Sequence, residues 1–317
     1  MKDQISTDAN SGKFQHPTLT ADGQERAYVE LSDPQTLWFN TGTLCNIACA
    51  NCYIDSSPTN DRLVYLSTQD VVDYLDQLEE RAWGVREIGF TGGEPFMCPD
   101  ILEMARAALD RNYRVLILTN AMRPMQRPRI KAGLTRLQRD FKDQLTLRIS
   151  VDHWSKDLHD KERGMGSFDA TLAGMEFLAE IGMRMDVAGR TVWGETEADA
   201  RRGYQALYER HGFEIDAHDP ARTLLFPEMD ASVAVPEITT ACWDILGKSP
   251  KDVMCSNSRM VIKRRGAAHP SVVACTLLVD DPQFELGRSL QEAEGSVRLN
   301  HPHCAKFCVL GGASCSA

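Results

Sequence analysis

The stretch GTLCNIACANCYIDSS, residues 42–57, holds three cysteines within eight positions, Cys45, Cys49 and Cys52, and the next cysteine along the chain is Cys98. A disulfide needs a pair of cysteines, and a structural zinc site normally has four protein ligands. A compact group of three is therefore incomplete by either rule. Either a fourth ligand comes from a distant part of the chain, or the open position is where a small molecule binds.

The composition places this cysteine loop in an ordinary globular protein. The 317 residues are 43% hydrophobic and 25% charged, which is enough for one large core or for a core and a smaller domain. We find no signal peptide and no run near the roughly 20 apolar residues of a membrane span, so we expect a cytoplasmic location and no membrane contact. Ten cysteines in that compartment favour metal binding or thiol chemistry over disulfides. A net charge of −10 argues against nucleic acid as a main partner.

Outward from the cysteine loop, strand and helix patterns alternate. The apolar patterns predict strands over residues 36–39, 87–90, 115–119, 145–151, 183–187 and 223–226. They predict helices over residues 67–83, 101–108, 130–141, 168–179 and 196–208. Six such units with parallel connections indicate an α/β fold, either a doubly wound sheet or a full or partial barrel.

In either architecture the ligand lies at the carboxyl ends of the strands, in the loops that follow them. The cysteine loop follows the first strand, and TGGEPF (residues 91–96) follows the second. TNA (residues 119–121) follows the third strand and SVDH (residues 150–153) follows the fourth. We therefore expect these four polar loops to meet at one mouth.

Beyond about Pro236 the alternation fades and cysteines become frequent again. The six later cysteines are Cys242, Cys255, Cys275, Cys304, Cys308 and Cys315. This change predicts an extension over residues 1–33, a core domain over 34–235 and a smaller cysteine-rich domain with its own metal over 236–317.

Together these residues resemble a known family. The C-x3-C-x2-C pattern of Cys45, Cys49 and Cys52, followed after the second strand by Gly92, Gly93 and Glu94, resembles the radical S-adenosylmethionine (SAM) superfamily. The resemblance covers roughly residues 36–226 and implies a partial (β/α)6 TIM-like barrel. Residues 149–182 are similar to the branch that contains molybdenum-cofactor and sulfatase-maturation enzymes. One departure is Asn51, where an aromatic residue is common in the family.

The resemblance implies a set of cofactors. Three thiolates hold three irons of a 4Fe-4S cluster, and the fourth iron is left to bind the amino and carboxylate groups of SAM. Reduction of the cluster then cleaves SAM to a 5′-deoxyadenosyl radical that abstracts hydrogen from a substrate. The electron would come from a reducing partner such as flavodoxin or ferredoxin.

The resemblance also implies which residues contact SAM. Gly92 and Gly93 would let the backbone approach the methionine moiety, and Glu94 would accept a hydrogen bond from its ammonium group. Ser150 and Asp152 are candidates for the ribose or carboxylate contacts, and Arg163 for pairing with the SAM carboxylate. The alternative for these last three is loop capping and a surface ion pair. No catalytic residue is assigned.

The late cysteines resemble the SPASM or twitch auxiliary-cluster domain, in which four cysteines suffice for one further 4Fe-4S cluster. The expected ligands are Cys255, Cys275, Cys304 and Cys308, with Cys315 as the substitute. The alternative is a structural zinc site. Cys98 and Cys242 receive no role.

The expected function is therefore a radical SAM enzyme that acts on a small molecule or a short peptide. The auxiliary cluster would accept an electron from the substrate or anchor it. Only about 35 residues precede the first strand, so we expect no N-terminal domain that captures a leader peptide. One alternative is a peptide (RiPP or protein) maturase of the same superfamily. An alternative of another class is a non-catalytic iron-sulfur or zinc-binding protein.

Overall fold

The computed structural model describes residues 10, 12–227 and 233–312. Within this part of the chain, nine strands form one sheet in the order β10-β9-β8-β2-β3-β4-β5-β6-β7, and β1 (Tyr28–Val29) pairs with β11 (Val297–Arg298) in a small second sheet. The strands of the main sheet are β2 (Thr36–Asn40), β3 (Glu87–Thr91), β4 (Arg114–Thr119), β5 (Leu145–Ser150), β6 (Arg184–Arg190), β7 (Thr223–Phe226), β8 (Ser258–Ile262), β9 (Ser271–Val273) and β10 (Glu285–Gly287).

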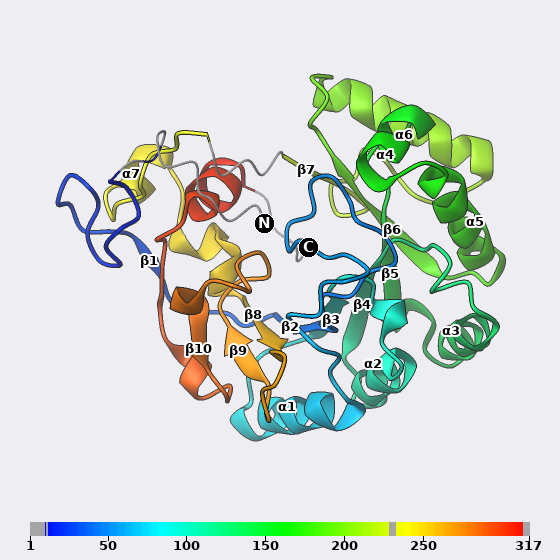
Figure 1. Ribbon diagram of the computed structural model, residues 1–317, viewed down its shortest axis with the longest axis horizontal. Coiled ribbons are helices and arrows are strands. Elements are labelled where there is room, and N and C mark those ends of the chain that lie inside the picture. Colours follow the sequence, from blue (N-terminus) through cyan, green and yellow to red (C-terminus); the bar gives the residue numbers. More distant parts are fainter. Residues whose placement is uncertain (1–9, 11, 228–232, 313–317) are drawn as a thin grey trace.

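The run from β8 to β7 is parallel throughout and curves into part of a barrel, with helices on its outer side (Figure 1). The helices are α1 (Thr68–Arg81), α2 (Ile101–Asp110), α3 (Pro128–Phe141), α4 (Lys156–Arg163), α5 (Ser167–Glu180), α6 (Glu197–His211) and α7 (Cys242–Leu246). Short 3₁₀ turns cover Pro95–Met97, Lys142–Gln144, Pro250–Asp252, Met254–Ser256, Pro282–Phe284 and Glu292–Glu294. The α/β fold expected from the sequence is confirmed.

Two of the predicted helix starts are capped as the sequence indicates. Ser67 accepts from the backbone N–H of Asp70, whose carboxylate accepts from the N–H of Ser67, which is a complete capping box for α1. Thr196 caps α6 by accepting from the N–H of Asp199. Helix α4 lies between two predicted elements and was not predicted, because its buried side chains, His159, Asp160 and Glu162, are polar.

The core has two layers because successive residues of a strand face opposite sides of the sheet. Leu37 and Phe39 of β2 face the outer helices, whereas Trp38 faces the barrel interior with Leu116 of β4. A Cβ atom on Gly89 would lie 2.3 Å from the Trp38 ring, so the indole rests directly on the β3 backbone.

The segment after β7 completes the sheet. Strand β8 pairs in parallel with β2, and β9 and β10 extend this edge in antiparallel fashion. Strand β1 (Tyr28–Val29) pairs with β11 (Val297–Arg298), and a buried ion pair joins Arg26 to Glu237. The predicted division at residue 235 stays a prediction.

No helix in the described residues is both long enough and apolar enough to cross a membrane. The expected cytoplasmic location stays a prediction.

Candidate active site

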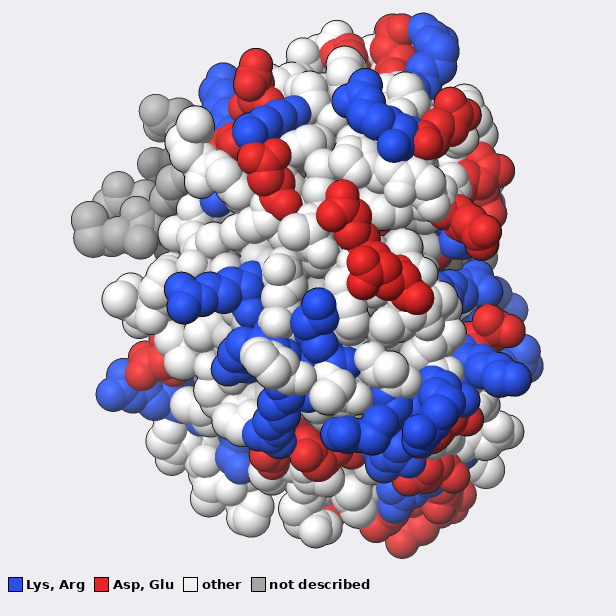
Figure 2. Space-filling model, turned by 90° about the vertical axis from the view of Figure 1, so that its right-hand side faces the viewer, with Lys and Arg blue, Asp and Glu red and all other residues white. Residues whose placement is uncertain are grey.

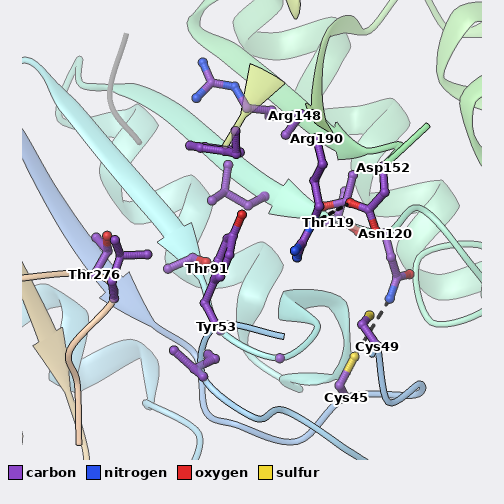
Figure 3. A pocket seen from close by; sticks show the side chains of 18 of the residues that line it. Cys45, Cys49, Tyr53, Thr91, Thr119, Asn120, Arg148, Asp152, Arg190 and Thr276 are labelled. Carbon is purple, nitrogen blue, oxygen red and sulfur yellow. Dashed lines mark hydrogen bonds and ion pairs between the residues drawn. The ribbon is translucent and has the colours of Figure 1, made fainter. Parts of the chain in front are cut away.

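A pocket opens at the carboxyl ends of β2 to β6, where the four polar loops meet as expected (Figure 3). In Figure 3 Cys45 and Cys49 lie on one side, Thr276 lies on the other, and Tyr53 and Thr91 lie between them. The remaining lining residues are Trp38, Asn40, Ile54, Gly92, Gly93, Leu118, Thr119, Asn120, Arg148, Ser150, Asp152, Arg163, Ala188, Gly189, Arg190, Phe226 and Leu277.

The three cysteines of the loop lie within electrostatic reach of one another. Cys45 is buried, and Cys49 and Cys52 are half-buried free thiols. Burial, with smaller contributions from the neighbouring charges of Glu94, Cys49 and Cys52, raises the pKa of Cys45 to about 12. Burial also raises the pKa of Cys49. A thiol must lose its proton to bind a metal, so metal binding at this loop would release protons.

The donors around the thiols suit sulfur ligands. The backbone N–H of Ser56 donates to Cys52 Sγ at 3.3 Å, and Asn120 Nδ2 lies 4.0 Å from Cys45 Sγ. Among the described residues, no three His, Cys, Asp or Glu side chains are gathered as the ligands of a single metal ion.

The two glycines of TGGEPF are needed because the cysteine loop lies against them. The N–H of Gly93 donates to Gly42 O at 2.8 Å, and the N–H of Glu94 donates to Leu44 O at 3.2 Å. A Cβ atom would lie 2.2 Å from Leu44 O at Gly93 and 2.6 Å from Gly42 O at Gly92, which also has φ of +137°. The glycines therefore hold the cysteine loop to the end of β3, and they line the pocket as well.

Glu94 is buried and accepts three hydrogen bonds from the protein. Its carboxylate accepts from Thr119 Oγ1 at 2.8 Å, from the N–H of Asn120 at 2.9 Å and from the N–H of Phe96 at 3.1 Å. Burial raises the pKa of this carboxyl above its usual value. Glu94 thus links the loop after β3 to the loop after β4, and its predicted contact with the SAM ammonium group stays a prediction.

Asp152 and Arg163 meet, together with a residue that sequence reasoning missed. Arg163 donates to both Asp152 oxygens, at 2.6 and 3.0 Å, and Arg190 Nε lies 3.4 Å from Oδ1. Burial opposes ionisation of Asp152, but the two arginines outweigh it and hold the pKa of the carboxyl below its usual value. Arg190 ends β6, so the rule that ligands lie at strand ends would have found it.

This cluster anchors the tip of the cysteine loop. The buried Glu162 accepts from the N–H and Nδ2 of Asn51 at 2.8 and 2.9 Å. Arg190 donates to Asn51 O at 2.8 Å and stacks over the Tyr53 ring at 4.7 Å from its centroid. Asn51, the one departure from the family pattern, is therefore a structural contact.

Asn40 provides a test of whether a ligand belongs in this pocket. Its side chain is fully buried and its Oδ1 accepts from the N–H of Gly42 at 2.9 Å. Its Nδ2 has no hydrogen-bond partner among the described residues. A buried donor without an acceptor is unfavourable unless a ligand supplies one. Together with the thiols and the glycine backbone, this donor fits SAM on a thiolate-held cluster.

Arg148 and Ser150 are two residues apart on β5, so their side chains share one face of the sheet, and both line the pocket. Arg148 lies 3.9 Å from Asp186, which Arg222 contacts more closely at 2.7 Å. Cys98, by contrast, is fully buried in the outer core, where its thiol is 3.6 Å from Leu66 O.

A second group of thiols lies in the C-terminal part. Cys255, Cys275 and Cys304 are close enough for their charges to interact, and burial raises the pKa of Cys255 to about 12. Cys308 lies one turn beyond Cys304 on the π-helical segment Cys304–Leu310. The N–H of Leu277 donates to Cys275 Sγ at 3.3 Å, and Leu277 lines the pocket. The second thiol group is thus adjacent to the far side of the pocket.

The other two late cysteines, Cys242 and Cys315, are not shown to belong to this group. Cys242 is half-buried at the start of α7, where it accepts from the N–H of Thr239 at 3.4 Å. Cys315, the predicted substitute ligand, lies outside the described residues.

Comparison with known proteins supports the assignment of this pocket to a radical SAM enzyme. Residues 39–202 match the Radical SAM superfamily. The mycofactocin maturase MftC of Mycolicibacterium smegmatis is 30% identical over 182 residues, which are 57% of this chain and 43% of that protein. The AdoMet-dependent heme synthase of Oleidesulfovibrio alaskensis is 29% identical over 180 residues, 56% of this chain and 42% of that protein. The chain therefore spans less than half the length of these two curated relatives.

The fold has solved counterparts. The crystal structure of Streptococcus suis SuiB bound to precursor peptide SuiA aligns with a TM-score of 0.59 at 14% identity, covering 81% of this chain and 63% of that chain. At this identity the likeness concerns the fold alone.

Proposed function

Because the chain belongs to the radical SAM superfamily, a superfamily of enzymes, we propose that it reductively cleaves SAM and abstracts hydrogen from a small molecule or a short peptide. The thiolates of Cys45, Cys49 and Cys52 would hold the 4Fe-4S cluster that binds SAM. When bound, the cluster and SAM supply a 5′-deoxyadenosyl radical that removes a hydrogen atom from an unactivated carbon. A reducing partner such as flavodoxin or ferredoxin would supply the electron.

The remaining residues of the pocket bind and orient. Gly92 and Gly93 hold the cysteine loop against the end of β3 and line the pocket, and Asn40 Nδ2 offers a buried donor. The ion pair of Asp152 with Arg163 supports the cysteine loop from the side of β5. Ser150, Asp152 and Arg163 remain our candidates for contacts with the ribose or carboxylate groups of SAM.

The observation that carries this proposal is the continuity of one pocket between two thiol groups. Cys45 and Cys49 line one side, while Thr276 and Leu277, which directly follow Cys275, line the other. We infer that Cys255, Cys275, Cys304 and Cys308 hold an auxiliary 4Fe-4S cluster that accepts an electron from the substrate or anchors it. Soft thiolate ligands suit such a cluster, and they also suit zinc.

A peptide maturase is the second candidate. The relative from Mycolicibacterium smegmatis is named a maturase, and the solved SuiB structure contains a precursor peptide. The aromatic lining of the pocket, with Trp38, Tyr53 and Phe226, suits an apolar or aromatic side chain of such a peptide.

The proposal is tested by anaerobic reconstitution with iron and sulfide, followed by incubation with SAM and dithionite. We expect 5′-deoxyadenosine from the wild type and from Cys98→Ala, and none from Cys49→Ala. A filled cluster that yields no 5′-deoxyadenosine would mean a non-catalytic iron-sulfur protein. Zinc as the sole metal after anaerobic purification would favour a structural metal protein instead.

A further inference from the structure

The loop and helix that follow β4 concentrate positive charge. Residues 121–142 contain seven Lys and Arg residues and one acidic residue, Asp140, in a chain whose net charge is −10. We call the surface formed by these basic residues the α3 face; its members are Arg123, Arg127, Arg129, Lys131, Arg136, Arg139 and Lys142. Figure 2 looks at the side on which α3 lies in Figure 1 and shows Lys and Arg side chains gathered across its lower half.

Part of this charge is not balanced within the molecule. Arg129 pairs with Glu103 at 3.1 Å and Arg139 pairs with Asp140 at 2.9 Å, both at exposed positions. Arg123 and Arg136 are exposed and form no ion pair with any described residue. Exposed charges of one sign produce a local potential that attracts a partner of the opposite sign.

The α3 face begins beside the cysteine loop. Asn120, whose Nδ2 lies 4.0 Å from Cys45 Sγ, also donates to Asn46 Oδ1 at 2.9 Å. Asn46 Nδ2 in turn lies 3.9 Å from Met122 Sδ, and Met122 directly precedes Arg123. A short series of contacts thus connects a thiol of the cysteine loop with the first basic residue of the surface.

An exposed apolar residue lies in the turn between two helices that contact these loops. Met165 is 92% exposed in the turn between α4 and α5. The backbone of Glu162 in α4 accepts from the N–H of Ala50 at 2.8 Å, and Gln126 donates to Ala170 O of α5 at 2.8 Å. The two helices that flank the turn are therefore joined, α4 to the tip of the cysteine loop and α5 to the loop that leads into α3. Methionine and arginine are enriched in protein interfaces.

We propose that the α3 face is the docking surface for an acidic one-electron carrier protein. This inference rests on the proposed function, in which the enzyme accepts one electron for each SAM cleaved. The reduced carrier would lose that electron and dissociate in its oxidised form. A carrier is favoured over a nucleic acid or a membrane because the face adjoins the cysteine loop, which would hold the cluster that receives the electron.

The test uses the reconstituted holoenzyme and a bacterial flavodoxin, which is acidic. We compare Arg123→Glu/Arg136→Glu with the matched control Arg86→Glu/Arg210→Glu, which reverses two exposed arginines on other elements that also form no ion pair with a described residue. We measure the Kd for oxidised flavodoxin by calorimetry at low ionic strength. In Arg123→Glu/Arg136→Glu the Kd should rise about tenfold or more, and it should depend less on salt concentration. In the control the Kd should stay at the wild-type value. Cluster bleaching by reduced flavodoxin should slow in parallel.

Reduction by dithionite separates the two proposals. If dithionite yields no 5′-deoxyadenosine from the wild type, the proposed function fails whatever flavodoxin does. If dithionite works but both charge variants bind flavodoxin as the wild type does, the docking proposal alone is wrong. It is also wrong if Arg123→Glu/Arg136→Glu instead loses binding to a labelled RNA oligonucleotide or to anionic vesicles while flavodoxin binding is unchanged.

Discussion

Arg163 donates two hydrogen bonds to the buried carboxylate of Asp152, at 2.6 and 3.0 Å, so the end of α4 is fixed to the end of β5 beside the cysteine loop. Removing one partner of a buried pair leaves an uncompensated charge. We therefore expect Asp152→Asn to lower the free energy of unfolding of the apoprotein by about 3–5 kcal/mol in urea. Asp169→Asn, which removes the exposed partner of Lys156, should change it little.

The same pair has a defined pH dependence. The pKa of Asp152 in the folded protein is below its unfolded value, so its stabilisation is fully present above the unfolded pKa of about 3.9 and is lost as the pH falls through the folded value. Equal unfolding free energies for wild type and Asp152→Asn at pH 7 would contradict this account.

Gly93→Ala should detach the cysteine loop from the end of β3. The added Cβ would lie 2.2 Å from Leu44 O, closer than atoms can approach, so the loop must move. We expect the reconstituted variant to hold less than about half the wild-type iron of the first cluster. Gly295→Ala is the control, because a Cβ there meets nothing within 4 Å. Unchanged iron and sulfide in Gly93→Ala would show that the contact is dispensable.

The auxiliary thiols should account for a separate portion of the iron. Cys255→Ala and Cys304→Ala are each expected to remove about four irons per chain and leave dithionite-driven SAM cleavage intact, because a 4Fe-4S cluster lacking one ligand is lost or labile. Cys242→Ala should retain all the iron. Equal iron content in Cys304→Ala and the wild type would exclude this ligand set.

Asn40→Leu should weaken SAM binding. The Nδ2 of Asn40 is a buried donor with no acceptor among the described residues, and a ligand acceptor would satisfy it. Loss of one such hydrogen bond corresponds to roughly 1 kcal/mol or more, so the Kd of the reconstituted protein for SAM should rise about fivefold or more by calorimetry. An unchanged Kd would place the bound SAM elsewhere in the pocket.

His159 should make the protein less stable in mild acid. Its ring is fully buried, and neither ring nitrogen has a hydrogen-bond partner among the described residues. Burial, and to a smaller extent the positive charge of Arg163, lowers the pKa of His159 to about 4. Between pH 6.5 and 4 the unfolded chain binds a proton that the folded chain does not, so stability falls by roughly 3 kcal/mol. His159→Leu should flatten the dependence of Tm on pH, whereas the exposed His269→Gln should not.

The sequence predicted the strands and most helices between residues 36 and 226, because one-sided burial imposes periodic apolar patterns on the chain. Helix α4 was not predicted because its buried side chains, His159, Asp160 and Glu162, are polar and form no apolar pattern. Strands β9 and β10 were not predicted because each has only three residues, and β8 was not predicted because no helix follows it to continue the alternation.

The sequence predicted the part of the site that is built from local motifs. Cys45, Cys49, Gly92 and Gly93 do line one pocket. Glu162 was missed because its role depends on contacts between elements far apart in the chain, which no local pattern records. Arg190 was missed although it follows the predicted strand over residues 183–187, where the strand-end rule applies. The sequence likewise did not predict the hydrogen bonds that Glu94 accepts, since its three donors come from two separate loops.

The parallel pairing of β8 with β2 has a consequence for the order of folding during synthesis. Until residues 258–262 leave the ribosome, β2 remains an edge strand, and its apolar side chains Leu37, Trp38 and Phe39 lack part of their cover. Unpaired apolar edges recruit other chains. A nascent or truncated chain ending near residue 227 should therefore aggregate, because β8, which covers the edge of β2, is synthesised later.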